Sequence, residues 1–184
     1  MTPAKRTPNE HTNTIQLEPL SVLQLSLLCD EIVADMCIYR PEFANLVHLH
    51  RNAGCRVKEL FHPQRWATVG NNTLQVQPQK HNALRILQLA DIGFTDADQF
   101  TATYADMQRL PYRQYERAFK LIVRTKNLWR LYEDGFAQPS THLFRHVKIK
   151  ELAAQGHDPE YIATWIGEKK VENLYYYLNS QYFQ

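Results

Sequence analysis

Two histidines and an arginine stand within five residues of one another in the segment HLFRH, at His142, Arg145 and His146. His142 and Arg145 are three residues apart, so a helix that begins here presents both side chains on one face. The N-terminus of a helix favours an anion, because backbone N–H groups and the helix dipole point toward it. Such a pair is often only part of an ordinary surface, so interpreting it as a phosphate site depends on other residues.

Three further segments contain residues that can act on a phosphate. The segment GCRVKEL places Arg56 and Glu59 three residues apart, where the carboxylate can hold the guanidinium in place. Lys80 stands in a turn-prone sequence between two segments with strand patterns. Tyr175 to Tyr177 follow one another near the C-terminus and offer a nucleophile. Taken singly, a surface ion pair, a solvated lysine and packing tyrosines explain these residues at least as well. Tyr175 and Tyr176 are expected to be packing residues, because a helix turns them to other faces than Tyr177.

Taken together and in this order, these residues resemble the phage integrase, or tyrosine site-specific recombinase, family. That family carries an arginine in a TGxRxxEL helix, a lysine in a β-hairpin, an HxxRH helix start and a GxxxxxIxxxLGH segment, followed by a tyrosine. NAGCRVKEL, VQPQKHNALRI and HLFRH match the first three motifs, and GHDPEYIATWIGE matches the fourth from Gly156 to Gly167. The expected tyrosine stands nine residues beyond Glu168, at Tyr177. The match covers roughly residues 20–180, which is nearly the whole chain.

The resemblance implies a role for each matched residue. The two arginines would grip the non-bridging oxygens of a phosphodiester, and His142 would add a hydrogen bond. Tyr177 would attack the phosphorus to form a 3′-phosphotyrosyl link, while Lys80 would protonate the leaving 5′ oxygen. No metal, ATP or other cofactor is expected, because the new ester keeps the energy of the broken bond. The implied catalytic residues are Arg56, Lys80, His142, Arg145, Glu168 and Tyr177, with Glu59 and His146 in supporting positions.

Glu168 departs from the family pattern, which has a histidine or tryptophan at this position. A carboxylate there can repel the phosphate, orient Tyr177 or pair with a nearby arginine. We also do not expect the N-terminal helical domain that completes the clamp around DNA in the usual recombinase. The seven residues after Tyr177 are few for a C-terminal segment that subunits exchange.

These observations leave competing hypotheses for the function. The first is an enzyme, a DNA site-specific recombinase or integrase that cleaves and exchanges strands through the phosphotyrosyl intermediate. The second is a catalytically impaired DNA-binding relative that regulates or competes with a full-length recombinase. A helical interaction protein with no DNA role requires five correctly ordered positions to be coincidental. A type IB topoisomerase uses a similar site, but the chain length and the HxxRH pattern favour a recombinase.

The charge distribution favours a nucleic-acid partner. The net charge is only +2, but residues 109–150 contain ten Lys and Arg residues against three acidic ones, interleaved with aromatic residues. Basic residues at this density are typical of a phosphate-backbone contact surface, although a solvated helix face is the more common explanation of charge alone. Arg85 either touches a DNA phosphate or is simply exposed. The residues predicted to bind DNA are Arg85, Arg113, Arg117, Lys120 and Arg124.

Length and composition indicate one soluble domain. We predict a flexible lead-in over residues 1–17 and a single domain over residues 18–184. The chain has no apolar run long enough for a membrane helix and no signal-peptide pattern. Its three cysteines show neither pairing nor metal-ligand spacing, which suits a reducing cytoplasm. The expected partners are double-stranded DNA and further copies of the chain assembled on it.

Hydrophobic periodicity predicts a mostly helical chain with one small hairpin. Ser140 or Thr141 is expected to cap the helix that carries the HLFRH segment, and Pro78 suggests an edge position or irregular pairing for the first strand. With the resemblance, this pattern predicts an α+β fold, mostly α-helical, like a tyrosine recombinase catalytic domain with a small β-hairpin or sheet. The expected helices span residues 20–36, 41–54, 56–61, 95–110, 112–129, 141–154, 158–167 and 171–181, and the expected strands 72–79 and 83–89.

Overall fold

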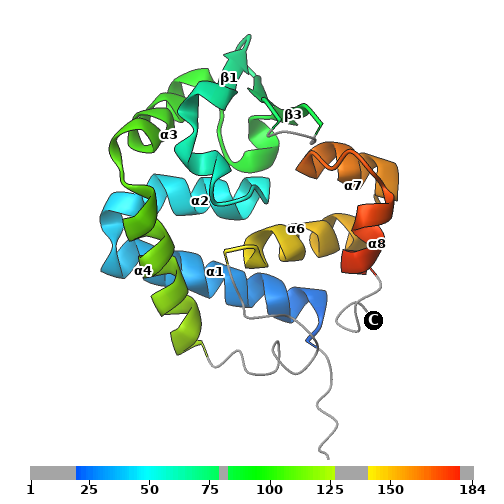
Figure 1. Ribbon diagram of the computed structural model, residues 1–184, viewed down its shortest axis with the longest axis horizontal. Coiled ribbons are helices and arrows are strands. Elements are labelled where there is room, and N and C mark those ends of the chain that lie inside the picture. The colour runs from blue at the N-terminus through cyan, green and yellow to red at the C-terminus, as the bar shows by residue number, and fades with distance from the viewer. Residues whose placement is uncertain (1–19, 79–82, 127–140, 179–184) are drawn as a thin grey trace, which may run out of the picture.

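A computed structural model of the protein describes residues 20–78, 83–126 and 141–178, and Figure 1 shows their arrangement. The helices are α1 (Val22–Tyr39), α2 (Ala44–Ala53), α3 (Ala97–Arg109), α4 (Tyr112–Thr125), α6 (Leu143–Ala154), α7 (Pro159–Ile166) and α8 (Glu172–Leu178). The strands are β1 (Trp66–Val69), β2 (Thr73–Val76) and β3 (Arg85–Gln88). Short 3-10 helices lie at Pro41–Phe43, Glu59–Phe61, Pro63–Arg65 and Ala90–Ile92.

Local signals explain where several helices begin and end. Ser21 and Gln24 form a reciprocal capping box at the start of α1. Gly54 ends α2 in the left-handed conformation, with φ 56°. The predicted cap of α6 was wrong, because its N-cap residue is His142, which makes no side-chain capping hydrogen bond. His142 therefore lies at the very start of α6, and Arg145 lies in its first turn.

The sheet has three antiparallel strands in the order β1-β2-β3. Trp66 of β1 pairs with Val76, and Thr73 of β2 pairs with Gln88. The sequence predicted β2 and β3 but missed β1. The edge position inferred from Pro78 was wrong, because β2 is the central strand and ends at Val76, before the proline.

The segment after Gly54 also differs from its prediction. Residues 56–61 were expected to form a helix, but they form a turn followed by the 3-10 helix Glu59–Phe61. The indole N–H of Trp66 donates to the Glu59 carbonyl at 2.7 Å, so this segment is tied to the start of the sheet.

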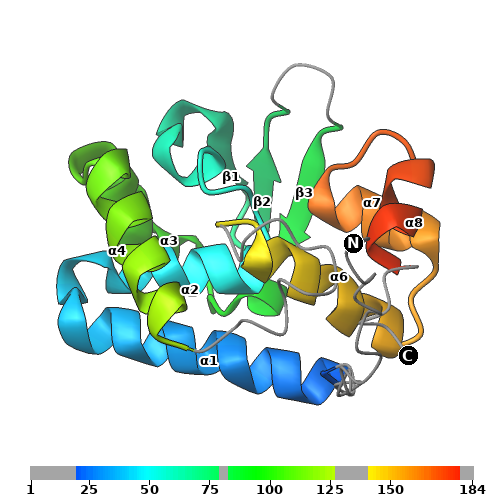
Figure 2. The same cartoon turned by 60° about the horizontal axis from the view of Figure 1, so that its bottom comes forward.

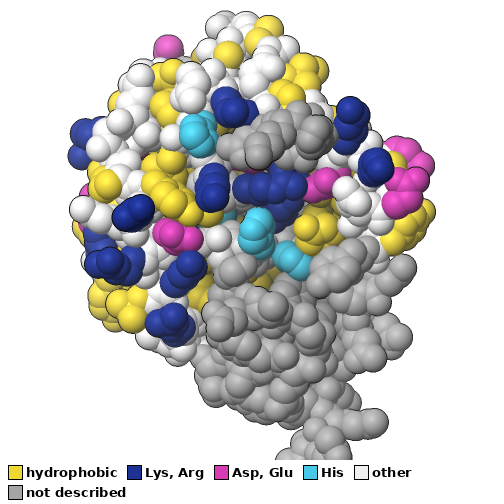
Figure 3. Space-filling view, in the orientation of Figure 1, with side chains coloured by type: hydrophobic (Ala, Val, Ile, Leu, Met, Phe, Trp, Pro, Cys, Tyr) yellow, Lys and Arg dark blue, Asp and Glu magenta, His cyan; other side chains and the backbone are white. Residues whose placement is uncertain are grey.

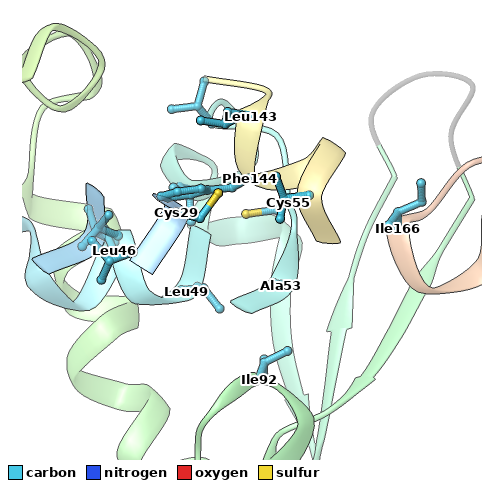
Figure 4. Close-up of a cluster of buried hydrophobic side chains, with 14 of the residues drawn as sticks. Cys29, Leu46, Leu49, Ala53, Cys55, Ile92, Leu143, Phe144 and Ile166 are labelled. Carbon is cyan, nitrogen blue, oxygen red and sulfur yellow. The ribbon is translucent and has the colours of Figure 1, made fainter. Parts of the chain in front are cut away.

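The core lies between α1, α2 and α6, and the sheet packs on the far side of α2 and α6 from α1 (Figures 1 and 2). Figure 4 shows part of this core, in which Cys29, Leu49, Cys55 and Phe144 are completely buried. All three cysteines are free thiols, and burial raises the pKa of Cys29 and Cys55 to about 12. These two cysteines therefore serve as small apolar core residues.

A buried ion pair fastens the three core helices to one another. Arg51 of α2 donates to both carboxylate oxygens of Glu151 on α6 and to Asp30 of α1. These contacts hold α6 against α2, and at the start of α6 the Arg145 Nη1 donates to the Gly54 carbonyl at the end of α2. Within the described residues, no helix is both long and apolar enough to span a membrane.

Candidate active site

Arg56 and Arg145 come together at the end of α2, although 89 positions separate them in the sequence. Arg56 follows the left-handed Gly54, and its Nη2 donates to Glu168 Oε1 at 2.7 Å. Arg145 is completely buried, and its Nη2 donates to the same carboxylate oxygen at 2.8 Å. The two guanidiniums, which we call the arginine pair, thus converge on one oxygen position. Two charged donors around one acceptor is an arrangement suited to binding an oxyanion.

Backbone carbonyls orient the guanidinium of Arg145. Its Nη1 donates to the carbonyl of Ile166 at 2.8 Å and to that of Gly54 at 3.3 Å. Gly54 itself approaches α6 so closely that a Cβ atom there would lie 2.8 Å from Lys148 Cβ. The glycine in the GCRVKEL segment therefore permits both the left-handed turn and the close packing of α2 against α6.

Glu59 supports Arg56, as the spacing predicted. Its Oε2 accepts from the backbone N–H of Arg56 at 2.9 Å, and its Oε1 lies 3.7 Å from Arg56 Nη1. The Glu59 side chain is buried, so this pair stabilises the turn that carries Arg56 and is not an ordinary surface ion pair.

Arg85 corrects a sequence expectation, because it is neither exposed nor available to DNA. It is only 2% exposed, and its Nη1 donates to Glu59 Oε2 at 3.3 Å. Its Nε donates to the carbonyl of Trp165 at 2.8 Å, and its Nη2 donates to that of Ala53. Arg85 therefore joins β3 to the end of α2 and to the end of α7. A buried cation was not expected in a strand next to a predicted hairpin turn, since burial is costly without a partner.

Glu168 lies where α7 ends, between the two arginines. Burial raises the pKa of its carboxyl, but the hydrogen bond and charge of Arg145 and the charge of Arg56 outweigh this effect and lower it. Glu168 is therefore ionised at neutral pH. Of the three possibilities stated for this residue, pairing with nearby arginines is the one that the structure shows.

Tyr177 on α8 lies beside the first turn of α6. Its ring meets the ring of His146 edge to face, with centroids 4.5 Å apart. Burial, and then the charges of His142, Lys150 and Arg145, lower the pKa of His146 to about 3, so this histidine is neutral. Burial and the charges of Arg145 and Arg56 also lower the pKa of His142. The same helix turn thus carries His142, Arg145 and the residue that contacts Tyr177.

Two expectations near the site have different outcomes. Lys80 lies outside the described residues, between β2 and β3. Tyr175 was expected to be a packing residue, but it is 47% exposed, so that expectation was wrong.

Asn173, which sequence reasoning did not single out, donates to Glu168 Oε2 at 3.4 Å from α8. No local pattern marks this asparagine, because its partner is set by the packing of α8.

The exposed face of α4 carries the basic residues expected to contact DNA. Arg113, Arg117, Lys120 and Arg124 are exposed and line one groove of about 510 Å³. Figure 3 shows Lys and Arg side chains gathered over α4 and, nearer the centre of the same face, beside histidines. The opposite side of α4 is apolar, with Tyr115 and Phe119 completely buried. Four of the ten basic residues counted in segment 109–150 therefore lie on one exposed face of one helix.

The fold is that of a tyrosine recombinase catalytic domain, a helical domain with a small antiparallel sheet. A solved structure titled "Crystal structure of XerA recombinase" superimposes with a TM-score of 0.53 and 15% identity. The superposition covers 93% of this chain and 61% of that one.

A viral protein is similar in sequence. The protein named "Putative integrase ORF241", from Acidianus two-tailed virus, is 24% identical over 129 residues. The aligned part is 70% of this chain but only 47% of the viral protein, so this chain spans about half the length of that relative. No model of a known protein family matches the sequence. Together, the fold and the sequence similarity show that the chain resembles the phage integrase, or tyrosine recombinase, family.

Proposed function

We propose that this chain is the catalytic domain of a DNA site-specific recombinase or integrase that works through a 3′-phosphotyrosyl intermediate. The observation that carries the proposal is the convergence of Arg56 and Arg145 on a single oxygen position. A phosphodiester under attack gathers negative charge on its non-bridging oxygens, and two guanidiniums stabilise that charge at any physiological pH.

The proposed reaction follows from the residues around that position. The phenolic oxygen of Tyr177 bonds to phosphorus as its proton passes to solvent, and the bond from phosphorus to the 5′ oxygen breaks. Lys80 protonates the leaving 5′ oxygen, and it removes that proton when the strand is rejoined. His142 donates to the phosphate from the start of α6. The contact between Tyr177 and His146 supports this assignment, because it brings the nucleophile to the helix turn that carries Arg145.

The exposed basic residues of α4 would hold the DNA backbone. Arg113, Arg117 and Arg124 recur on one side of the helix and can follow a run of phosphates. Strand exchange requires paired cleavages, so we also propose that copies of the chain assemble on DNA.

The first test is a plasmid assay without added metal or ATP. The protein is incubated with supercoiled plasmid, and relaxed topoisomers and a denaturant-resistant protein–DNA band are measured. Tyr177→Phe should abolish both products, because it removes the attacking oxygen. Tyr175→Phe is the matched control, since Tyr175 is an exposed neighbour on the same helix, and it should leave both products unchanged. An adduct that persists in Tyr177→Phe would assign the nucleophile to another residue.

A second candidate function is an impaired DNA-binding relative that regulates or competes with a full recombinase. The observation that favours it is the Glu168 carboxylate, which already occupies the oxygen position between the arginines. This function predicts salt-sensitive binding to duplex DNA without any adduct. Plasmid relaxation that is lost in Arg145→Ala would exclude it.

A further inference from the structure

The carboxylate of Glu168 stands in the position that an anionic ligand of the arginine pair would take. One oxygen, Oε1, accepts from Arg56 at 2.7 Å and from Arg145 at 2.8 Å, which are typical lengths for charge-assisted hydrogen bonds. Gly167 ends α7 in the left-handed conformation, with φ 76°, and this turn positions Glu168 beside the arginine pair. The Glu168 N–H donates to the Ala163 carbonyl at 2.9 Å. The hydrogen-bonded turn at the end of α7 therefore holds the Glu168 backbone in this position.

Two buried donor atoms of the same arginines make no hydrogen bond within the described part of the chain. Among the residues that the structure describes, Arg56 Nη1 and Arg145 Nε are buried without a hydrogen-bond partner. A buried donor without an acceptor is costly, and native proteins rarely leave one. A single carboxylate oxygen cannot serve these donors as well, whereas a phosphate group carries several acceptor oxygens. A phosphate group can therefore accept hydrogen bonds from more donors of these two arginines than the single Glu168 oxygen does.

We infer that Glu168 is an intramolecular ligand of this anion site, and that an incoming phosphate group has to replace it. The identity of the natural ligand as a phosphodiester of DNA rests on the proposed function. Two anions cannot share one oxygen position beside the same guanidiniums, so the charge of Glu168 opposes phosphate entry. The lowered pKa of Glu168 keeps that charge in place at neutral pH.

Displacement of the Glu168 carboxylate would also affect α8, the helix that carries the proposed nucleophile. Asn173 of α8 donates to Glu168 Oε2 at 3.4 Å, and Tyr177 lies one helical turn further on. When phosphate displaces the carboxylate, α8 loses this contact. Occupation of the anion site and the position of Tyr177 are therefore coupled through one side chain.

Binding of inorganic phosphate tests the inference. Calorimetric titration at pH 7.5 is carried out on the wild-type protein, on Glu168→Gln and on Glu160→Gln. The glutamine at position 168 keeps the shape of the side chain but removes its charge, so phosphate should bind about tenfold more tightly or better. Glu160 is an exposed acid on α7, so Glu160→Gln changes the net charge equally and should bind phosphate like the wild type. Equal or weaker binding by Glu168→Gln would overturn the inference.

Removing Glu168 leaves two cations facing each other, so the variant can also lose stability. If Glu168→Gln is unfolded in the absence of anions, phosphate should restore its far-UV circular dichroism. Glu168→His, which takes the residue of the family motif, provides a second variant with the same expected gain in phosphate affinity. The gain should disappear when Arg145→Ala is added to either variant. Failure of both variants to gain affinity in a folded state contradicts the inference.

The plasmid assay separates this inference from the proposed function. A gain in phosphate affinity without any protein–DNA adduct would support the role of Glu168 and reject the recombinase activity. An adduct in the wild type without a gain in Glu168→Gln would support the activity and reject the role of Glu168.

Discussion

Five charged side chains share one region between α2, β3, α6 and α7. They are Arg56, Arg85, Arg145, Glu59 and Glu168, and each carboxylate serves two guanidiniums. Such a network is costly to bury, but it is still more costly to break, because removing one member leaves its partner as an uncompensated charge. At the residue scale, Arg85 organises this region although its own side chain is almost completely buried.

Replacing Arg85 with methionine tests its structural role. The variant fills a similar volume but leaves Glu59 without its most buried partner, so we expect the free energy of unfolding to fall by about 3 to 5 kcal/mol. The measurement is urea unfolding followed by circular dichroism. Arg109→Met is the control, because Arg109 pairs with Asp106 but is largely exposed, and its cost should stay below about 1 kcal/mol. Similar costs for the two variants would refute a structural role for Arg85.

At the scale of elements, the turn after α7 positions the site. Gly167 has φ 76°, and a Cβ atom there would lie 2.6 Å from Arg85 Cγ. The glycine therefore does two things, because it permits the left-handed turn and lets α7 approach β3. This turn brings Glu168 to the arginine pair and the Ile166 carbonyl to Arg145.

Alanine substitution separates the two roles of Gly167. Gly70, in the turn between β1 and β2, has φ 62° but has no atom within 4 Å of a Cβ, so Gly70→Ala measures backbone strain alone. We expect Gly70→Ala to cost about 1 to 2 kcal/mol. Gly167→Ala should cost about 1 to 3 kcal/mol more, because it also overpacks Arg85. Thermal and urea unfolding give both values, and equal costs would mean that Arg85 moves aside freely.

At the scale of the whole molecule, Lys and Arg side chains gather over α4 and toward the centre of the same face (Figure 3). α4 packs its apolar face against the core, and this packing decides which of its charges reach solvent. A surface of this kind binds DNA mainly through the release of counterions from phosphates. Its contribution should therefore appear in the salt dependence of binding.

The double variant Arg117→Gln and Arg124→Gln tests this surface. Each lost phosphate contact should lower the slope of log affinity against log salt concentration by about 0.9, so the slope should fall by up to about 2. Fluorescence anisotropy with a labelled duplex measures the slope between low and moderate salt. Arg109→Gln serves as the control, since this cation is already paired with Asp106, and it should change the slope little. An unchanged slope in the double variant would remove α4 from the interface.

The sequence by itself determined most of the helices, the strands β2 and β3, and the types of residue at the site. These features depend on local signals, such as the periodicity of apolar residues, the glycines that end helices and the spacing of Arg56 from Glu59. It missed β1, whose short segment lies between a 3-10 helix and a turn and carries little periodic pattern.

Only the tertiary structure decided which charges meet. Arg56 and Glu168 are 112 positions apart, and Arg85 and Trp165 are 80 positions apart, so no local pattern relates them. Arginines are exposed on α4, whereas Arg85 of β3 is buried. The difference arises because the ends of α2 and α7 pack over the Arg85 side chain. Burial made Arg85 a structural residue, and the packing of α7 against α6 and β3 brought Glu168 to the arginine pair.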